Sequence, residues 1–389
     1  MRDHQSGGPQ PPEHEDEWLA RWQQRARALG FSQIGVAGVD LREAEPGLLA
    51  WLAAGMHGSM DYMARHGLKR ARPAELLPGT LSVITARMDY LPGAPGQPVG
   101  EPLGEAWRQA ELARLQRPGE AVVSLYARGR DYHKVLRQRL QRLADELQAE
   151  LGPLGARVFT DSAPVLEVEL ATRSGLGWRG KHTLTLSREA GSMFFLGEIF
   201  VDRALPASPP VSGHCGACTA CITGCPTGAI VAPGRVDARR CLSYLSIEHE
   251  GAIPVELRRA MGNRLYGCDD CQLLCPWNKF ARSSPVGDFQ PRPHWADMRL
   301  GTLWAWGEAE FLQRTEGSAI RRIGWARWRR NLIVVCGNAL ADERLPEAEA
   351  RALRAALTQA LHAGPEAADP VLCEHLHWAL SSGSGGQAL

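Results

Sequence analysis

Eight cysteines between positions 215 and 275 constrain this chain more than any other feature. The first four are spaced C-x2-C-x2-C-x3-C and end at a proline, Pro226. A second run, C-x2-C-x3-C, also ends at a proline, Pro276, and one more cysteine lies between the runs. Two four-iron clusters require eight thiolates, and this spacing lets the last cysteine of each run bind the neighbouring cluster.

The crossover predicts a ligand set for each [4Fe-4S] cluster. The set for cluster 1 is Cys215, Cys218, Cys221 and Cys275. The set for cluster 2 is Cys225, Cys241, Cys268 and Cys271. Zinc knuckles also use C-x2-C pairs, but they rarely add a third cysteine and a C-P step. Disulfides need an oxidising compartment, which nothing in the sequence indicates.

Charge and hydropathy limit where the protein works. The formal net charge is +1 over 389 residues, so any basic surface for nucleic acid must be local. No apolar run reaches the length of a membrane span. Residues 1–17 are polar and contain neither an apolar signal core nor a twin-arginine motif. We therefore expect a disordered lead-in and a monomeric, cytoplasmic protein that does not contact a membrane.

The pattern of elements predicts three domains after the lead-in. Strands and helices alternate over 18–205, which is typical of an α/β domain built on a central sheet. Residues 206–284 hold the cysteines and predict a bacterial ferredoxin-like domain. Residues 285–389 predict an all-α, HEAT-like segment of short paired helices. Within the first domain, residues 92–119 are rich in Pro and Gly and predict a mobile surface insert.

Asp161 and Ser162 directly follow a predicted strand, at the end where open sheets bind ligands. A carboxyl enclosed by a bulky apolar cofactor has a raised pKa and can donate a proton near neutral pH. The structural alternative is capping of a helix expected over 163–174, and the residues alone favour capping.

Asp131 begins a long predicted helix, so N-capping is its expected role, and His133 is expected on the surface. The run from Asp131 to His133 approaches the D-x-H-x-x-G motif of proteins that ligate cobalt through histidine. Leu136 stands in place of the glycine, so that motif is not matched.

Arginines alternate with Trp325 and Trp328 near the C-terminal helices. They are Arg321, Arg322, Arg327, Arg329 and Arg330. Arginines with aromatic residues suit phosphate contact and base stacking. A solvated helix face with its tryptophans in the core has the same pattern, so both interpretations fit the residues.

Longer blocks of sequence point to a known family. They are His57-Gly58-x-Met60-Asp61, Ala127 to Lys134, Asp161-Ser162-Ala163-Pro164, Gly175 to His182, Gly262 to Cys271 and Glu316 to Arg322. With the cysteine runs, these blocks make most of residues 18–340 closely resemble the epoxyqueuosine reductases. These are cobalamin-dependent iron–sulfur enzymes that complete queuosine in tRNA.

The resemblance implies a fold and a reaction. Cobalamin would bind between the α/β domain and the cluster domain, with no histidine on cobalt. The two clusters would reduce the cobalt to Co(I), which deoxygenates the epoxide to an alkene and water in the final step of queuosine biosynthesis. The implied proton donor is Asp161, which reverses the preference for capping. Asp131 is the alternative, because its context matches equally closely.

The resemblance also implies contacts and partners. The implied cobalamin contacts are Arg70, Asp161, Ser162, His182, Thr183, Ser192, Phe194, Ser243 and Asp269. The substrate would be a tRNA anticodon loop whose modified base flips over the cobalt, with the five arginines on its phosphates. A low-potential carrier such as flavodoxin or ferredoxin would supply the electrons.

Three other interpretations remain. A corrinoid reductive dehalogenase shares the cofactors, but such proteins usually carry a twin-arginine signal. A ferredoxin-like electron carrier would not need the large first domain or the glycine-rich turn at 175–182. An RNA-binding module with structural clusters would bind tRNA without turnover.

Overall fold

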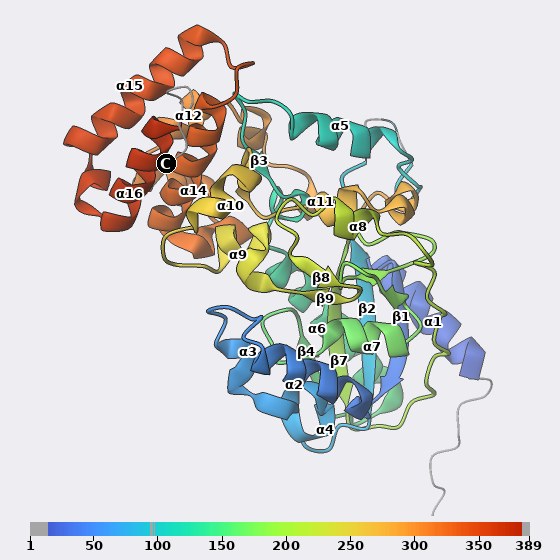
Figure 1. Ribbon diagram of the computed structural model, residues 1–389. Coiled ribbons are helices and arrows are strands. Elements are labelled where there is room, and N and C mark those ends of the chain that lie inside the picture. The colour runs from blue at the N-terminus through green and yellow to red at the C-terminus, as the bar shows by residue number, and fades with distance from the viewer. Residues whose placement is uncertain (1–14, 94–95, 97, 383–389) are drawn as a thin grey trace, which may run out of the picture.

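The computed structural model describes residues 15–93, 96 and 98–382. Residues 1–14 of the expected lead-in lie outside this range, and 15–17 already belong to the first helix. Figure 1 shows a twisted sheet with its helices at the bottom, loops and short helices in the centre, and longer helices at the upper left. Within the described part of the chain, no helix is long and apolar enough to cross a membrane.

The central sheet has the order β1-β2-β7-β4. Its strands are β1 Gln33–Gly38, β2 Ser82–Asp89, β7 Phe194–Val201 and β4 Ala156–Phe159. Every pair in this sheet is antiparallel. The sheet expected at the centre of this domain is present, and its strands are antiparallel although alternating elements more often build a parallel sheet. Asp161 nevertheless follows the end of β4, as expected.

Helices cover both faces of this sheet. On one face, α1 Glu15–Ala28 and α6 Tyr132–Leu151 close a buried apolar core. On the other face, α7 Glu167–Arg173 packs against β1, β2 and β7. Short elements surround them: α2 Glu45–Ala53, α3 Tyr62–Arg65, α4 Pro73–Leu76, β5 Trp178–Arg179 and β6 Thr185–Leu186.

The start of α7 differs from the prediction. Its N-cap is Leu166, so Pro164 precedes the helix and Asp161 does not cap it. Asp161 instead has a φ of 41°, a left-handed conformation that few residues other than glycine adopt. Asp131, by contrast, caps α6 as predicted: its carboxylate accepts the backbone N–H of His133 at 3.1 Å.

The first domain and the cysteine domain share structure. β3 Val122–Val123 pairs in parallel with β10 Arg264–Tyr266 rather than joining the central sheet. The predicted mobile insert contains α5 Ala106–Arg114, and Asn263 Nδ2 donates to the Arg114 carbonyl oxygen at 2.9 Å. This part of the insert is thus anchored to the cysteine domain. That domain also contains α8 Ala220–Thr223, β8 Ile230–Ala232, β9 Arg235–Val236, α9 Leu242–Ile247, α10 Val255–Met261 and α11 Asp270–Leu273.

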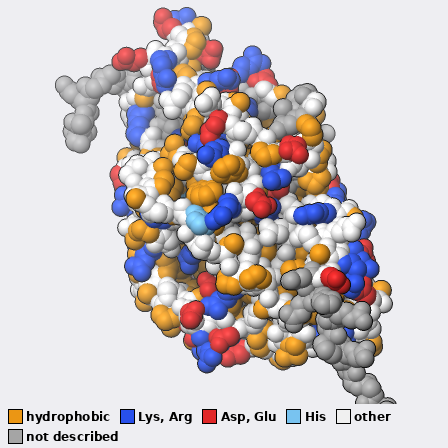
Figure 2. Space-filling view, turned by 90° about the vertical axis from the view of Figure 1, so that its right-hand side faces the viewer, with side chains coloured by type: hydrophobic (Ala, Val, Ile, Leu, Met, Phe, Trp, Pro, Cys, Tyr) orange, Lys and Arg blue, Asp and Glu red, His pale blue; other side chains and the backbone are white. Residues whose placement is uncertain are grey.

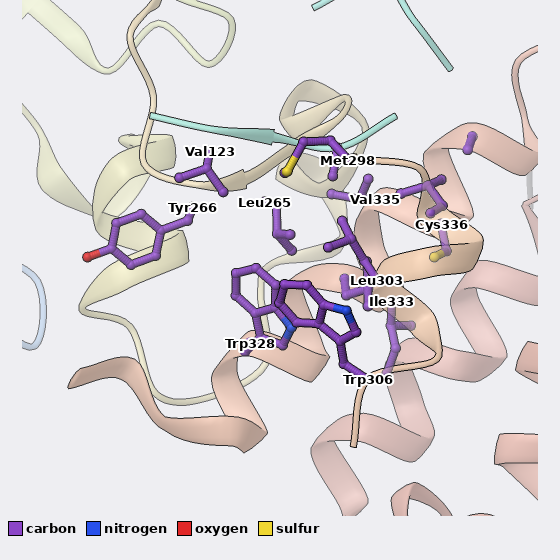
Figure 3. Packing of buried hydrophobic residues seen from close by; sticks show 14 of the residues in the cluster. Val123, Leu265, Tyr266, Met298, Leu303, Trp306, Trp328, Ile333, Val335 and Cys336 are labelled. Carbon is purple, nitrogen blue, oxygen red and sulfur yellow. The ribbon is translucent and has the colours of Figure 1, made fainter. Parts of the chain in front are cut away.

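The C-terminal region is helical, as predicted. Its helices are α12 Leu300–Trp304, α13 Glu308–Arg314, α14 Gly324–Leu340, α15 Glu347–Ala363 and α16 Pro370–Ser381. Residues 305–307 separate α12 from α13. Figure 3 shows Trp306 against Trp328, whose rings stack with centroids 5.9 Å apart. The same core includes Val123 and Leu265, so it joins all three regions.

Two of the five arginines expected to contact RNA lie inside the protein. The Arg330 guanidinium is 1% exposed and donates to three backbone carbonyl oxygens near the end of α9, each at 2.7 Å. Arg329 forms a buried ion pair with Glu366 at 2.7 Å. The prediction of phosphate contact is therefore wrong for Arg329 and Arg330, because these cations satisfy buried acceptors of the protein itself.

Arg321 and Arg322 remain exposed, while Arg327 is half-buried and donates to the backbone carbonyl of Ile247 at 3.0 Å. On the face shown in Figure 2, basic and acidic side chains are interspersed and do not form one extended basic surface.

Candidate functional site

Four cysteines surround one cavity of about 390 Å³. They are Cys215, Cys218, Cys221 and Cys275, the four expected at cluster 1. Cys275 belongs to the second run, so the fold brings together the residues that the crossover requires. Among the described residues, no three His, Cys, Asp or Glu side chains converge tightly enough for a single metal ion. A four-iron cubane holds its cysteine sulfurs further apart than one ion does.

Aromatic and basic side chains close this cavity. The Trp178 indole N–H donates to Cys215 Sγ at 3.5 Å, and the Trp178 and Trp277 rings meet edge-on with centroids 5.2 Å apart. Lys181 Nζ donates to the carbonyl oxygens of Gly216 and Cys218 at 2.6 and 2.8 Å, which fixes the first cysteine loop.

The four cysteines expected at cluster 2 are partly buried. Burial raises the pKa of the Cys241 thiol, and the nearby Cys225 raises it further. Burial and then Cys241 raise the pKa of Cys271. Cys268 Sγ lies 2.9 Å from Asp270 Oδ2.

Asp131 and Asp161 are the two ends of one hydrogen-bonded chain. His133 Nδ1 lies 2.8 Å from Asp131 Oδ1, and His133 Nε2 lies 3.1 Å from Asp161 Oδ2. The Tyr132 hydroxyl donates to the same Asp161 oxygen, and its ring stacks on Phe195 with centroids 4.2 Å apart. The two aspartates that the sequence offers as alternatives therefore belong to a single network, and His133 is not merely a surface residue.

The hydrogen bonds between Asp131, His133 and Asp161 favour the protonated form of His133. Burial acts to lower its pKa, but hydrogen bonds to Asp131 and Asp161 raise the pKa of His133 to about 9. An imidazole between two carboxylates can donate to both only when both ring nitrogens carry protons. Burial acts to raise the pKa of Asp161, but hydrogen bonds from His133 and Tyr132 lower it overall. At neutral pH the network thus contains an imidazolium beside a carboxylate.

Two further acids lie behind Asp161. Glu167 Oε1 accepts the backbone N–H of Asp161 at 2.6 Å. Burial and then the charge of Asp161 raise the pKa of Glu167 to about 8. Glu198 on β7 is fully buried, and burial raises its pKa well above the usual range. Glu167 is therefore largely protonated at neutral pH, because the low-dielectric interior disfavours a second charge near Asp161.

Buried polar atoms without partners gather on the sheet face that α7 covers. Glu198 lies directly opposite Thr85, so their side chains share this face, and Arg87 and Asp89 follow Thr85 at two-residue steps. The next hairpin adds His182 and Thr185. We call these six residues the polar sheet face. Four of the six have buried atoms without any partner among the described residues: Thr85 Oγ1, His182 Nε2, Thr185 Oγ1 and both carboxylate oxygens of Glu198. Arg87 Nε and Asp89 Oδ1 make no hydrogen bond but form an ion pair with each other at 3.7 Å.

An unsatisfied buried polar atom costs about 1–3 kcal/mol, so a set of five on this face and the adjoining hairpin indicates a ligand with several hydrogen-bonding groups. Burial also lowers the pKa of His182 to about 4, which keeps the imidazole neutral. Its Nδ1 accepts the Leu184 N–H at 3.2 Å, so Nε2 carries the proton and can donate one hydrogen bond.

Three of the residues expected to contact cobalamin already have protein partners. Asp269 accepts the N–H of Leu125 at 2.8 Å, and its other oxygen accepts the Ser124 hydroxyl. Ser192 N–H donates to Asn278 Oδ1 at 2.6 Å. The Arg70 guanidinium donates to the carbonyl oxygens of residues 62 and 63 at 2.7 and 3.1 Å.

The other expected contacts are less constrained. The Phe194 ring lies under the Arg87 guanidinium, 5.2 Å from its carbon. Thr183 follows His182 in the hairpin turn and has a φ of 77°. Ser162 is exposed beside Asp161, and Ser243 is half-buried in α9.

Sequence reasoning missed Tyr132, Glu167 and most of the polar sheet face. One signal was present: Glu198 is a single acid within the apolar run Phe194–Val201, where a buried strand has no ordinary place for a carboxylate. Nothing local in the sequence indicates that His133 bridges two aspartates 30 residues apart.

Two family models match the chain. Residues 214–278 match a "4Fe-4S double cluster binding domain". Residues 70–162 match "Epoxyqueuosine reductase QueG, DUF1730". The chain therefore carries a 4Fe-4S double-cluster domain, as the cysteine spacing predicts.

Curated relatives match over nearly the full length. An epoxyqueuosine reductase from Alicycliphilus denitrificans is 63% identical over 94% of this chain and 98% of its own length. The protein of the same name from Escherichia coli K12 is 52% identical over 91% of this chain and 86% of its own.

Solved structures agree. An epoxyqueuosine reductase crystallised with a tRNA-Tyr epoxyqueuosine-modified stem loop matches with a TM-score of 0.81 and 26% identity, over 96% of this chain and 92% of that one. A Bacillus subtilis structure, with its catalytic aspartate loop swung out of the active site, matches with a TM-score of 0.79 and 25% identity over the same shares. The resemblance seen in the sequence is confirmed: this chain belongs to the epoxyqueuosine reductase family.

Proposed function

We propose that this protein reduces epoxyqueuosine to queuosine in the anticodon loop of a tRNA. The observation that carries the proposal is the Asp131–His133–Asp161 chain, a proton store that reaches the surface within the fold of this family. The overall reaction converts an epoxide, two electrons and two protons into an alkene and water. In this proposal the electrons pass through the double-cluster domain, and at least one proton comes from the Asp131–His133–Asp161 network.

The residues of the polar sheet face fit cobalamin. The corrin ring carries a rim of amide side chains, and these can donate to Glu198 and Asp89 and accept from Arg87. The bonds to Glu198 would satisfy two buried oxygens that have no partner among the described residues. We therefore propose that cobalamin is held against the polar sheet face, with Phe194, Thr183 and Ser243 as further contacts. When bound, cobalamin supplies a metal that accepts electrons singly and acts on the epoxide as a strong nucleophile.

In this proposal the proton is stored on His133 and delivered through Asp161: the imidazolium protonates the Asp161 carboxylate, which passes the proton to the epoxide oxygen. The side chain of Asp161 is 53% exposed, so it can reach a base brought to the surface. Asp131 holds the imidazole in position through Nδ1 while this transfer takes place. Tyr132 keeps the Asp161 carboxylate in place with a second hydrogen bond.

The tRNA contact in this proposal rests on Arg321 and Arg322. Both are exposed, and the charge of Arg322 acts on the Asp161 carboxylate. These two arginines can therefore hold phosphates next to the proton donor, whereas Arg329 and Arg330 cannot.

The pH profile tests the role of His133. A group whose pKa is raised to about 9 keeps its proton below that pH and loses it above. We expect turnover to stay level from pH 7 to about 8.5 and to fall as pH rises through about 9. His133→Gln holds no transferable proton, so its turnover is expected to be about tenfold to a hundredfold lower at pH 7, with no fall near pH 9. An unchanged fall near pH 9 in this variant would assign the titration to another group.

Anaerobic reconstitution tests the proposal as a whole. The protein is loaded with iron, sulfide and cobalamin and then assayed on epoxyqueuosine-containing tRNA with mass spectrometry of the released nucleosides. We expect about eight irons, one corrinoid and conversion to queuosine. Eight irons without corrinoid uptake would contradict the cobalamin site. Binding of tRNA without conversion would support the alternative that the protein is an RNA-binding module with structural clusters.

A further inference from the structure

Cluster 1 lies at the protein surface. Its expected ligand Cys218 is exposed, whereas Cys221 and Cys275 are buried, and each cysteine expected at cluster 2 is only partly exposed. The residues around Cys218, from 216 to 219, are exposed as well. An electron from outside the protein therefore has its shortest route to the iron–sulfur domain at Cys218.

The surface around Cys218 is strongly basic, although the whole chain is nearly neutral. The segments 178–190, 204–234 and 276–283 form the cavity walls and their surroundings. Their cations are Arg179, Lys181, Arg188, Lys279 and Arg282. Their only carboxylate is Glu189, and residues 204–234 contain no charged side chain at all. One further acid, Glu101, lies on the segment that is hydrogen-bonded to residues 281–283. We call this surface, centred on Cys218, the cluster 1 face.

Most of this charge is not neutralised by the protein. Arg179, Arg188 and Lys279 are exposed, and none of them forms an ion pair with a described residue. Arg188 contacts the His214 ring, and Lys279 lies 4.8 Å from the Phe280 ring. Elsewhere on the chain many arginines are paired with a carboxylate, for example Arg239 with Asp237 at 2.7 Å. An unpaired basic cluster raises the local concentration of anionic partners and speeds their association.

We propose that the cluster 1 face is the docking surface for a small acidic electron-carrier protein. Each encounter oxidises the carrier by one electron and reduces cluster 1 by one electron, so two encounters supply the two electrons for one epoxide. The inference rests on the proposed function, since that reaction is what consumes the electrons. It adds the place of entry and the charge of the partner.

The same cations attract RNA phosphates, but other features of this face favour a protein. Leu184 and Val211 are apolar and remain 36% and 43% exposed, which suits the apolar centre of a protein interface. The proton donor Asp161 is surrounded by other elements, namely β4, the start of α6 and, through Arg322, residues 319–323. A stem loop placed at Asp161 has its phosphates near those elements.

Charge reversal tests the docking surface on the holoenzyme. Arg179→Glu/Arg188→Glu changes two exposed cations that line neither the cysteine cavity nor the Asp161 chain. Cluster reduction is followed by the loss of visible absorbance after anaerobic mixing, which requires no tRNA and no turnover. One donor is flavodoxin hydroquinone, an acidic carrier. The other is reduced methyl viologen, a small cation. Arg137→Glu, at an exposed and unpaired position of α6, is the matched control.

The two donors give opposite expectations. Reduction by flavodoxin is expected to slow at least tenfold in the double variant and to slow with added salt in the natural protein, because both changes weaken steering. Reduction by methyl viologen is expected to stay the same or become faster. Arg137→Glu is expected to behave like the natural protein with both donors.

Three results would overturn the proposal. They are an unchanged rate with flavodoxin, an equal loss with both donors, and weaker binding of the tRNA stem loop with normal reduction. The last result would make the cluster 1 face an RNA surface. Failure of the proposed function alone would look different, since the clusters would accept electrons normally while epoxyqueuosine stayed unreduced.

Discussion

Asp161→Asn is expected to lower turnover about a thousandfold while leaving both clusters and cobalamin binding intact. An amide has nearly the shape of the carboxylate but cannot donate a proton of comparable acidity, and general acids typically contribute a hundredfold to ten-thousandfold. The asparagine side chain keeps an oxygen that can accept from the Tyr132 hydroxyl and from His133 Nε2. The segment around residue 161 should therefore keep its position. The measurement is single-turnover conversion of epoxyqueuosine, with iron and corrinoid counted in the same sample.

Asp131→Asn is the matched comparison. In our assignment Asp131 positions His133 and does not touch the substrate, so its loss is expected to cost only about tenfold. It is also expected to lower the pH at which turnover falls, because one of the two carboxylates that raise the His133 pKa is gone. Full activity in Asp161→Asn together with a thousandfold loss in Asp131→Asn would exchange the two roles.

The cysteine site could be predicted because its information is local. Ligands two or three residues apart are held by one loop, so spacing alone indicates the cluster type. The hydrogen-bonded network of Asp131, His133 and Asp161 could not be predicted in the same way. Asp131 and His133 start α6, whereas Asp161 follows β4, and only the packing of α6 against the sheet brings them within hydrogen-bond distance.

Predictions based on composition were wrong where contacts between distant residues determine the structure. Residues 92–119 look like a loop, yet Asn263 anchors the end of α5 from 149 residues away. Arg330 looks like an RNA ligand, yet it donates to the carbonyl oxygens of residues 245, 249 and 251. In both cases the partner is distant in sequence, and the local pattern contains no sign of it. Glu198 is the reverse case, since one acid in an apolar strand predicts a buried functional group.

A set of cysteine variants is expected to separate the two clusters. Cys275→Ala should reduce the iron content from about eight to about four per protein, because one cluster loses a ligand and the other keeps all four. Cys275 and Cys218 line one cavity, so the double variant Cys218→Ala/Cys275→Ala should lose no more iron than either single variant. Both changes remove ligands of the same cluster.

Cys271→Ala/Cys275→Ala should behave differently, although these cysteines are neighbours in sequence. In the crossover arrangement they bind different clusters, so iron content should fall to near zero. Cys336→Ala is the control, because this thiol is buried among the C-terminal helices and should leave all eight irons. If Cys271→Ala/Cys275→Ala kept about four irons, the second run would serve one cluster alone. The cluster nearest the surface would then be bound by cysteines of the first run alone. Cys275 would not be a ligand of the cluster that contains Cys218.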